Sequence, residues 1–85
     1  MNCQPNDLAV VVRMADADEA YRAYTRRLVG RVVRVRKVSI DASGRPVWSL
    51  RSPFWMRHKG DRFMVTGIHD FLLQPIRSRA DEHPA

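Results

Sequence analysis

The chain has 85 residues, of which 45% are hydrophobic and 28% are charged, and its formal net charge is +6. A chain of this length buries only about 60–65% of its unfolded surface, which leaves room for one modest core and excludes a two-lobed enzyme or a dinucleotide-binding fold. Its apolar content is too high for a disordered chain. We expect a single β-barrel domain over residues 1–76 and a polar, disordered C-terminal tail over residues 77–85.

The charge balance is 15 basic against 9 acidic residues, and Lys37 and Lys59 are the only lysines. A basic chain attracts nucleic acids, anionic membranes and acidic proteins alike, although arginine-rich composition also follows from a GC-rich genome. No apolar run approaches the roughly 20 residues that span a bilayer, and no signal peptide is recognisable. The single cysteine, Cys3, excludes an intramolecular disulfide. We expect a cytoplasmic protein without membrane contact, and a monomer by default.

The first predicted elements are a strand and a helix. The valine-rich run Asp7–Arg13 is short and favours a strand. From Asp16 onward the apolar residues recur at helical spacing, Glu19 stands three residues after a candidate Asp16 cap, and Gly30 suits a left-handed helix end. We therefore expect one inserted helix over about residues 16–29.

Short strands separated by turn signals fill the rest of the chain. We expect strands over residues 31–40, 47–51 and 62–66, turns over 41–46 and 58–61, a one-turn helix from Asp70, and a short last strand to Ile76. Alternation slips near Arg36-Lys37, so a β-bulge is needed there to keep one buried face. Either Val47, or Trp48 together with Leu50, faces inward. Pro53 ends that strand, and Pro75 lies at a sheet edge or at the start of the last strand. Four or five such strands with one helical detour predict a mainly β fold, a small closed barrel.

Two segments resemble small SH3-like barrels, including the KOW-type modules of transcription and ribosomal proteins. Asn6–Val11 is similar to their opening x-G-D-x-V-x-V strand, with Asn6 in place of the usual glycine, and Gly30–Val35 is similar to the following G-x-V-x-x-V. The resemblance implies an SH3-like barrel with a one-turn helix before the last strand. The predicted helix departs from the short KOW loop, so the resemblance implies no RNA or ribosome role. Cys3–Val11 and Asp70–Ile76 also resemble small phage or prophage proteins of unknown role.

Aromatic and basic residues alternate between Arg51 and Phe63, and this mixture is the strongest chemical signal in the sequence. Flat rings can stack on unpaired bases while cations hold phosphates. The alternative is that the large apolar residues of this stretch form the core: Phe54, Trp55, Met56, Phe63 and Val65. If one ring is exposed, we choose Trp55, because Trp48 lies in the better-patterned strand.

A second basic run follows Gly30 and could track a phosphate backbone, or could be the solvated face of a sheet. The candidate nucleic-acid-binding residues are Arg31, Arg34, Arg36, Lys37, Trp55, Arg57 and Lys59. The candidate protein-contact residues are Tyr21 and Tyr24, since tyrosine is common at interfaces; the alternative is that both cover the barrel mouth.

Neither a metal site nor a catalytic site is indicated. The histidines His58, His69 and His83 and the cysteine lack the C-x-x-C or H-x-x-x-H spacing that closes a local metal site. Asp70 is adjacent to His69 in sequence without needing to meet it in space, and its expected role is to cap the turn that follows. We expect no cofactor, no metal and no enzyme activity.

The sequence leaves three function hypotheses. The first is a non-enzymatic binding or adaptor module that contacts another protein through the sheet edge or the tyrosines of the inserted helix. The alternative is a non-specific nucleic-acid-binding protein that uses the arginine-rich strand and an exposed aromatic ring. A small hydrolase or metal-dependent enzyme is a distant third.

Overall fold

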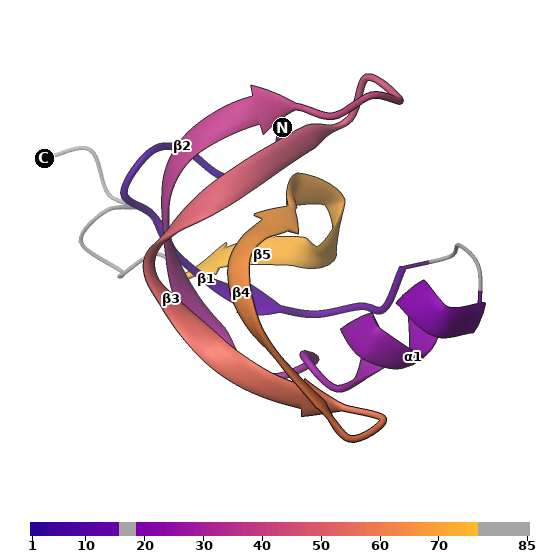
Figure 1. The fold of residues 1–85 in the computed structure, drawn as a ribbon. Helices are drawn as coiled ribbons and strands as arrows, with labels where there is room; N and C mark the ends of the chain where they lie inside the picture. Colours follow the sequence, from indigo (N-terminus) through magenta and orange to yellow (C-terminus); the bar gives the residue numbers. More distant parts are fainter. Residues whose placement is uncertain (16–18, 77–85) are drawn as a thin grey trace, which may run out of the picture.

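Five strands form one antiparallel sheet in the order β4-β3-β2-β1-β5, in a computed structural model that describes residues 1–15 and 19–76 (Figure 1). The elements are β1 Leu8–Val11, α1 Glu19–Arg26, β2 Val32–Ile40, β3 Pro46–His58, β4 Asp61–His69, the 3-10 turn η1 Asp70–Leu72, and β5 Leu73–Ile76. The predicted mainly β class is confirmed, with one short inserted helix and a 3-10 turn before the last strand. The predicted tail over residues 77–85 lies outside the described residues.

β2 and β3 are strongly bent, and their pairings contain register shifts. The shift between β2 and β3 falls between Val35 and Val38, which confirms the predicted bulge. The shift between β3 and β4 falls between Ser49 and Phe54. Such irregularities bend a strand and increase its twist. As a result β3 sweeps from the β2–β3 hairpin at the top of Figure 1 to the β3–β4 hairpin at the bottom.

The prediction that this strand ends at Pro53 is wrong, because β3 continues to His58. Pro53 lies within the register shift between β3 and β4, where its missing N–H removes no ladder hydrogen bond. β4 also continues past Gly67, where the sequence predicts its end. A Cβ atom at Gly67 would lie 3.1 Å from the carbonyl oxygen of Trp48, so the glycine lets the two strands approach closely.

The core lies inside the curve of the sheet and centres on Trp48, which is fully buried. Its predicted inward position, and that of Leu50, is confirmed. The other buried apolar residues come from the strands, from η1, from the N-terminal segment and from the segments on either side of α1. They are Cys3, Ala9, Val11, Ala15, Leu28, Val33, Val35, Val65, Ile68, Leu72 and Leu73. One core of this size is what a chain of this length can form.

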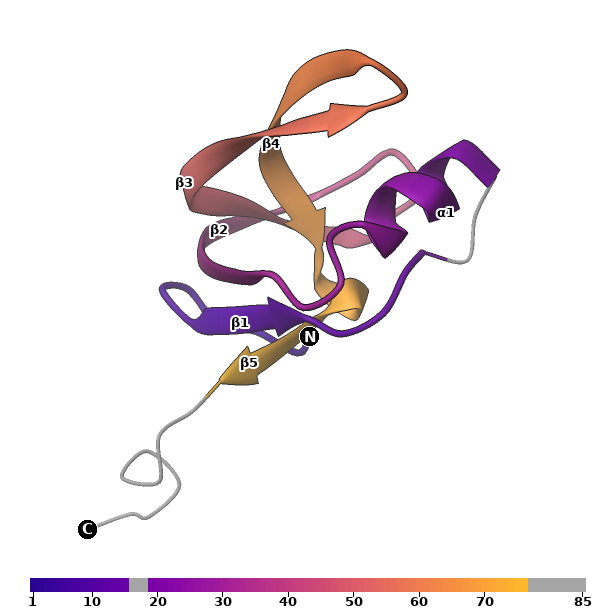
Figure 2. The same cartoon turned by 90° about the horizontal axis from the view of Figure 1, so that it is seen from below.

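The sheet is open between β4 and β5, whereas the sequence predicts a closed barrel. η1 turns the chain from β4 into β5, which lies beside β1 at the opposite end of the sheet from the β3–β4 hairpin (Figure 2). The N-terminal segment takes part in this junction, because the Asn2 side-chain amide donates to the backbone carbonyls of Asp70 and Leu73. These hydrogen bonds fasten the N-terminal segment to η1 and to the start of β5.

Asp70 is buried at this junction and joins three parts of the chain. Its carboxylate accepts hydrogen bonds from the backbone N–H groups of Asn2 (2.6 Å) and Cys3 (2.9 Å) and from Nε1 of Trp48 (2.7 Å). Burial opposes ionisation, but these hydrogen bonds outweigh it and hold the pKa of Asp70 below its usual 3.8. The prediction that Asp70 caps η1 is wrong: the residue in the cap position is His69, which makes no side-chain cap bond.

The inserted helix is shorter than predicted, and residues 16–18 of the predicted range lie outside the described residues. Its C-terminal end is fastened to the core. Thr25 is fully buried; its hydroxyl accepts a hydrogen bond from the N–H of Ala15 (2.8 Å) and lies 3.0 Å from the carbonyl of Tyr21. Gly30 has φ +93° and donates its N–H to Val11, so the predicted left-handed position returns the chain to the sheet.

Candidate nucleic-acid interface

The outward side of β2, β3 and β4 is strongly basic. These strands contain six arginine or lysine residues and one acidic residue, Asp61, which lies beside the β3–β4 turn. The arginines of β2 alternate with the buried Val33 and Val35, and Arg51 follows the buried Leu50, so strand geometry turns their side chains away from the core. We call the exposed residues on this side the basic face: Arg34, Arg36, Arg51, Trp55, Arg57 and Arg62.

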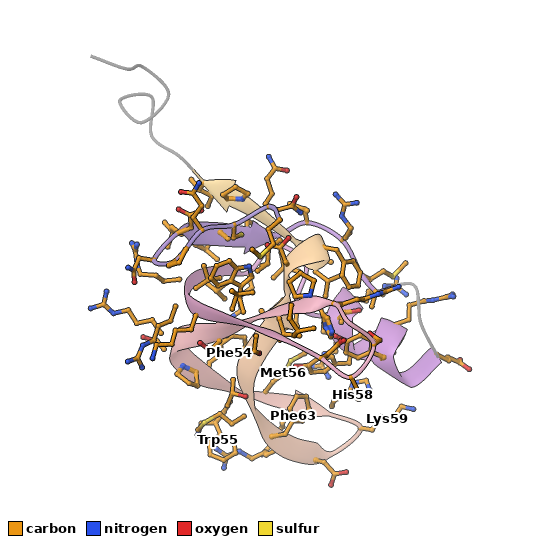
Figure 3. The ribbon with its side chains drawn as sticks, turned by 90° about the horizontal axis from the view of Figure 1, so that it is seen from above. Phe54, Trp55, Met56, His58, Lys59 and Phe63 are labelled. Carbon is orange, nitrogen blue, oxygen red and sulfur yellow. The ribbon has the colours of Figure 1, made fainter. Side chains whose placement is uncertain are left out.

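Trp55 is the exposed ring of the β3–β4 hairpin, with 57% of its surface accessible. It pairs across the hairpin with Met64, which is 44% exposed, and the next pair along is Arg57 with Arg62. The guanidinium of Arg62 lies 4.9 Å from the centroid of the Trp55 ring, a cation–π contact. In Figure 3 the Trp55 side chain projects away from the ribbon. By contrast, the neighbouring Phe54 and Met56 pack against the core.

A polar hollow lies at the other end of the basic face. It has a volume of about 470 Å³ and is lined by Asn6, Arg36 and Arg51; we call it the arginine hollow. Arg34 lies beside it, because its Nη1 donates a 2.7 Å hydrogen bond to the carbonyl of Asn6. Asn6 has φ +70°, a conformation that asparagine tolerates better than most residues. Three guanidinium groups therefore gather around this loop, and the described residues that line the hollow include no acidic side chain.

The structure brings together four of the seven residues predicted to bind nucleic acid: Arg34, Arg36, Trp55 and Arg57. The other three lie apart. Arg31 places its guanidinium 3.6 Å from the centroid of the Phe54 ring, a ring that packs on the core side of β3. Lys37 lies in the bulge, where its N–H donates to the Ser49 hydroxyl, and Lys59 occupies the β3–β4 turn with φ +52°.

Arg51 and Arg62 belong to the stretch that the sequence singles out, but they are not among the seven candidate binding residues. Arg62 could have been found from the two-residue turn at Lys59-Gly60, because that turn sets Arg57 opposite Arg62. Arg51 could have been found from its position next to the inward-facing Leu50. Asn6 lies beside Arg34 of β2 although the two are 28 residues apart, and no local sequence pattern indicates this contact.

The two candidate protein-contact tyrosines lie between α1 and the sheet. Their rings stack on each other with centroids 5.9 Å apart, and the ring of Tyr24 lies 5.1 Å from that of Phe63. Both are half-buried and pack against the core. This arrangement matches the alternative in which they cover the core, and it leaves the outer surface of α1 without an exposed tyrosine pair.

Tyr21 also belongs to a hydrogen-bonded chain that the sequence did not reveal. Its hydroxyl lies 2.7 Å from Nδ1 of His69, and Nε2 of His69 lies 2.7 Å from the carboxylate of Asp41. The hydroxyl of Ser43, the N–H of Arg45 and His69 hold the pKa of Asp41 well below its usual value. The acid that His69 meets is therefore Asp41 and not its sequence neighbour Asp70.

This tyrosine, histidine and aspartate run in the order of a nucleophile, base and orienting acid, and the phenol is held in its protonated form. Burial, followed by the nearby charge of Asp41, raises the pKa of the Tyr21 phenol. A raised pKa disfavours the phenolate that a nucleophile would need. The chain connects α1, β4 and the β2–β3 turn.

Within residues 1–15 and 19–76, no group of three histidine, cysteine, aspartate or glutamate side chains is placed to hold a metal ion. Both ring nitrogens of His58 are enclosed and make no hydrogen bond to the described part of the chain. None of the helices in that part has the length and apolar content needed to cross a bilayer. No protein-family model, curated protein or solved structure matches this chain.

Proposed function

We propose that this protein is a non-enzymatic module that binds nucleic acid, without sequence preference, through the basic face. The observation that carries the proposal is the exposed ring of Trp55 beside two paired arginines, on strands with six basic residues and one acidic residue. Aromatic side chains stack on bases of any sequence, and arginines contact the phosphates between them. The basic face offers both an aromatic ring that can stack on a base and arginines that can contact phosphates.

Charge repulsion adds to this argument. Arg57 and Arg62 stand directly opposite each other across the hairpin, where like charges destabilise a strand pair. A bound polyanion would neutralise both at once and release counterions, which is the main source of sequence-independent affinity for nucleic acids. The arrangement favours an anionic ligand over a neutral one.

The second candidate is a protein with an acidic surface; the first hypothesis from the sequence was a protein partner of unspecified chemistry. The exposed pair of Trp55 and Met64 favours it, because tryptophan, methionine and arginine are enriched in protein interfaces. The half-buried positions of Tyr21 and Tyr24 remove the helix surface as its basis. We therefore rank this candidate below nucleic acid.

The test is fluorescence anisotropy of a labelled 20-nucleotide single strand, titrated with the protein at several salt concentrations. If four or five phosphates are contacted, the affinity should fall roughly a hundredfold between 50 and 200 mM salt, since each contact contributes about −0.7 to the salt slope. Absence of binding at 50 mM salt would contradict the proposal. A complex with an acidic protein that weakens as the salt concentration rises would then support the second candidate.

A matched pair of variants locates the interface. Arg57→Gln removes one charge from the basic face, and Arg27→Gln removes one charge from an exposed position after α1. We expect Arg57→Gln to weaken binding and to reduce the salt slope by about 0.7, because one phosphate contact is lost. Arg27→Gln should change the slope little. Equal effects of the two variants would show that net charge, and not the basic face, determines binding.

A further inference from the structure

The basic face has two different ends, and their chemistry is complementary. At one end Trp55 offers an aromatic surface that is more than half exposed. At the other end the arginine hollow offers guanidinium groups without an aromatic ring, since it is lined by Asn6, Arg36 and Arg51. A ring suits a base and a cationic hollow suits a phosphate, so the two ends match two parts of the same nucleotide chain.

We propose that the ligand is a single strand lying along β3, with one base stacked on Trp55 and one phosphate group of the same strand held in the arginine hollow. This inference rests on the proposed function and specifies its ligand. A duplex keeps the faces of its bases stacked inside the helix, so it cannot offer one to Trp55 without unpairing. A single strand can offer both groups at no such cost.

The hollow is suited to an anion on electrostatic grounds. Arg36 and Arg51 both line it, and Arg34 is held next to it by its hydrogen bond to the carbonyl of Asn6. Within the described residues Arg36 and Arg51 form no ion pair with an acidic side chain. Their mutual repulsion is therefore relieved by an anion that contacts both, and a phosphate oxygen pair matches the planar fork of a guanidinium.

Strand geometry sets the length of ligand that can reach both ends. Trp55 is four residues from Arg51 on β3, so the two positions are at most about 13 Å apart at roughly 3.3 Å per residue. A stacked single strand advances about 3.4 Å per nucleotide, so about four nucleotides span this distance. A stacked dinucleotide advances only about 3.4 Å, whereas an octanucleotide is long enough to reach both ends.

The experiment is an NMR titration of the uniformly ¹⁵N-labelled full chain with three probes: thymidine dinucleotide, octathymidylate and a 12-base-pair duplex. With octathymidylate we expect the Trp55 indole N–H, the Asn6 amide and the Arg36 side-chain N–H signals to shift together, with one dissociation constant. The dinucleotide should shift one end only, and the duplex should leave the Trp55 indole unshifted. The buried Trp48 indole serves as an internal control.

Variants supply the second measurement. Trp55→Ala should weaken octathymidylate binding by about 5-fold to 150-fold, the range found when one base-stacking ring is removed. Arg51→Gln should weaken octathymidylate binding by more than the control Arg27→Gln does, but should not affect dinucleotide binding at Trp55. All three positions are exposed, so the fold should be retained.

The outcomes separate this inference from the proposed function. If octathymidylate binds with the expected salt dependence but the Asn6 and Arg36 signals do not move, the hollow holds no phosphate and the inference is wrong while the proposed function stands. A duplex that binds as tightly and shifts Trp55 equally would also overturn it. If none of the three probes binds at 50 mM salt, both proposals fail.

Discussion

The two tryptophans of β3 are seven residues apart and have opposite surroundings. Trp48 is fully buried and donates its indole N–H to the carboxylate of Asp70. Trp55 is 57% exposed and lies under the guanidinium of Arg62. One indole is thus held by an anion inside the core and the other by a cation in solvent. The comparison shows that a single long strand contributes to stability at one end and offers a binding surface at the other.

The odd spacing of the two tryptophans along β3 sets them on opposite faces of the strand. Near Trp48, β3 pairs with β4 through Ser49, and the pairing resumes at Phe54. The irregularity leaves the alternation of β3 unchanged, because Leu50 before it and Phe54 after it both face the core. One tryptophan of β3 is therefore part of the core, and the other is exposed on the surface.

The largest effect that would sharpen this comparison is that of Trp48→Ala. We expect it to lower the free energy of unfolding by about 3–5 kcal/mol, because a large buried side chain is removed and Asp70 loses a hydrogen-bond donor. Urea denaturation followed by far-ultraviolet circular dichroism measures it. A midpoint equal to that of the parent would show that the core does not centre on Trp48.

Asp70→Asn tests the anionic partner of the buried indole. The carboxylate accepts three hydrogen bonds, two from backbone N–H groups and one from Trp48, and an amide cannot accept them all. We expect a loss of about 1–3 kcal/mol, as for other buried groups left unpaired. Arg62→Gln, which alters the cation beside the exposed indole, is the matched control and should leave stability nearly unchanged.

The same carboxylate should make stability depend on acid pH. The folded-state pKa values of Asp70 and Asp41 both lie below 3.8, so their contributions are fully present above about pH 4 and are lost as the pH falls through the folded values. The free energy of unfolding should therefore decrease below pH 4. In Asp70→Asn the free energy of unfolding should decrease less below pH 4, because Asp41 is then the only one of these two carboxylates that can still be protonated. An identical pH profile would mean that Asp70 has no depressed pKa.

A smaller effect is expected for Tyr21→Phe, which keeps the ring but removes the hydrogen bond to His69. The loss should be about 0.5–1.5 kcal/mol, the usual net contribution of one such bond. A double-mutant cycle with His69→Phe should show coupling between the two positions. Additive effects would mean that the helix is held by ring packing with Tyr24 and Phe63 instead.

The smallest effect on stability is that of Trp55→Ala. Because the ring is mostly exposed, its removal should change the free energy of unfolding by no more than about 0.5 kcal/mol. Thermal denaturation of this variant beside Trp48→Ala provides a direct comparison of the two ends of β3. A loss as large as that of Trp48→Ala would place Trp55 in the core and remove the basis of the binding proposals.

Local patterns predicted much of the fold and part of the site. Alternation predicted the bulge near Arg36-Lys37, and the better-patterned strand around Trp48 correctly left Trp55 as the exposed ring. The errors share a different cause, since each depends on residues far apart in sequence. The sequence predicts a strand end at Pro53 because a register shift with β4 cannot be recognised from one strand alone. Asp41 and His69 are 28 residues apart, and no spacing rule brings them together.

One strand that reaches from the interior to the solvent also constrains how relatives of this chain could diverge. Inserting or deleting one residue between Ser49 and Phe54 would exchange inward and outward positions along the rest of β3. The edit would turn Trp55 toward the interior and expose Phe54 and Met56, whereas point substitutions at the same sites would leave orientation intact. Substitutions in this segment should therefore be tolerated far more readily than insertions or deletions.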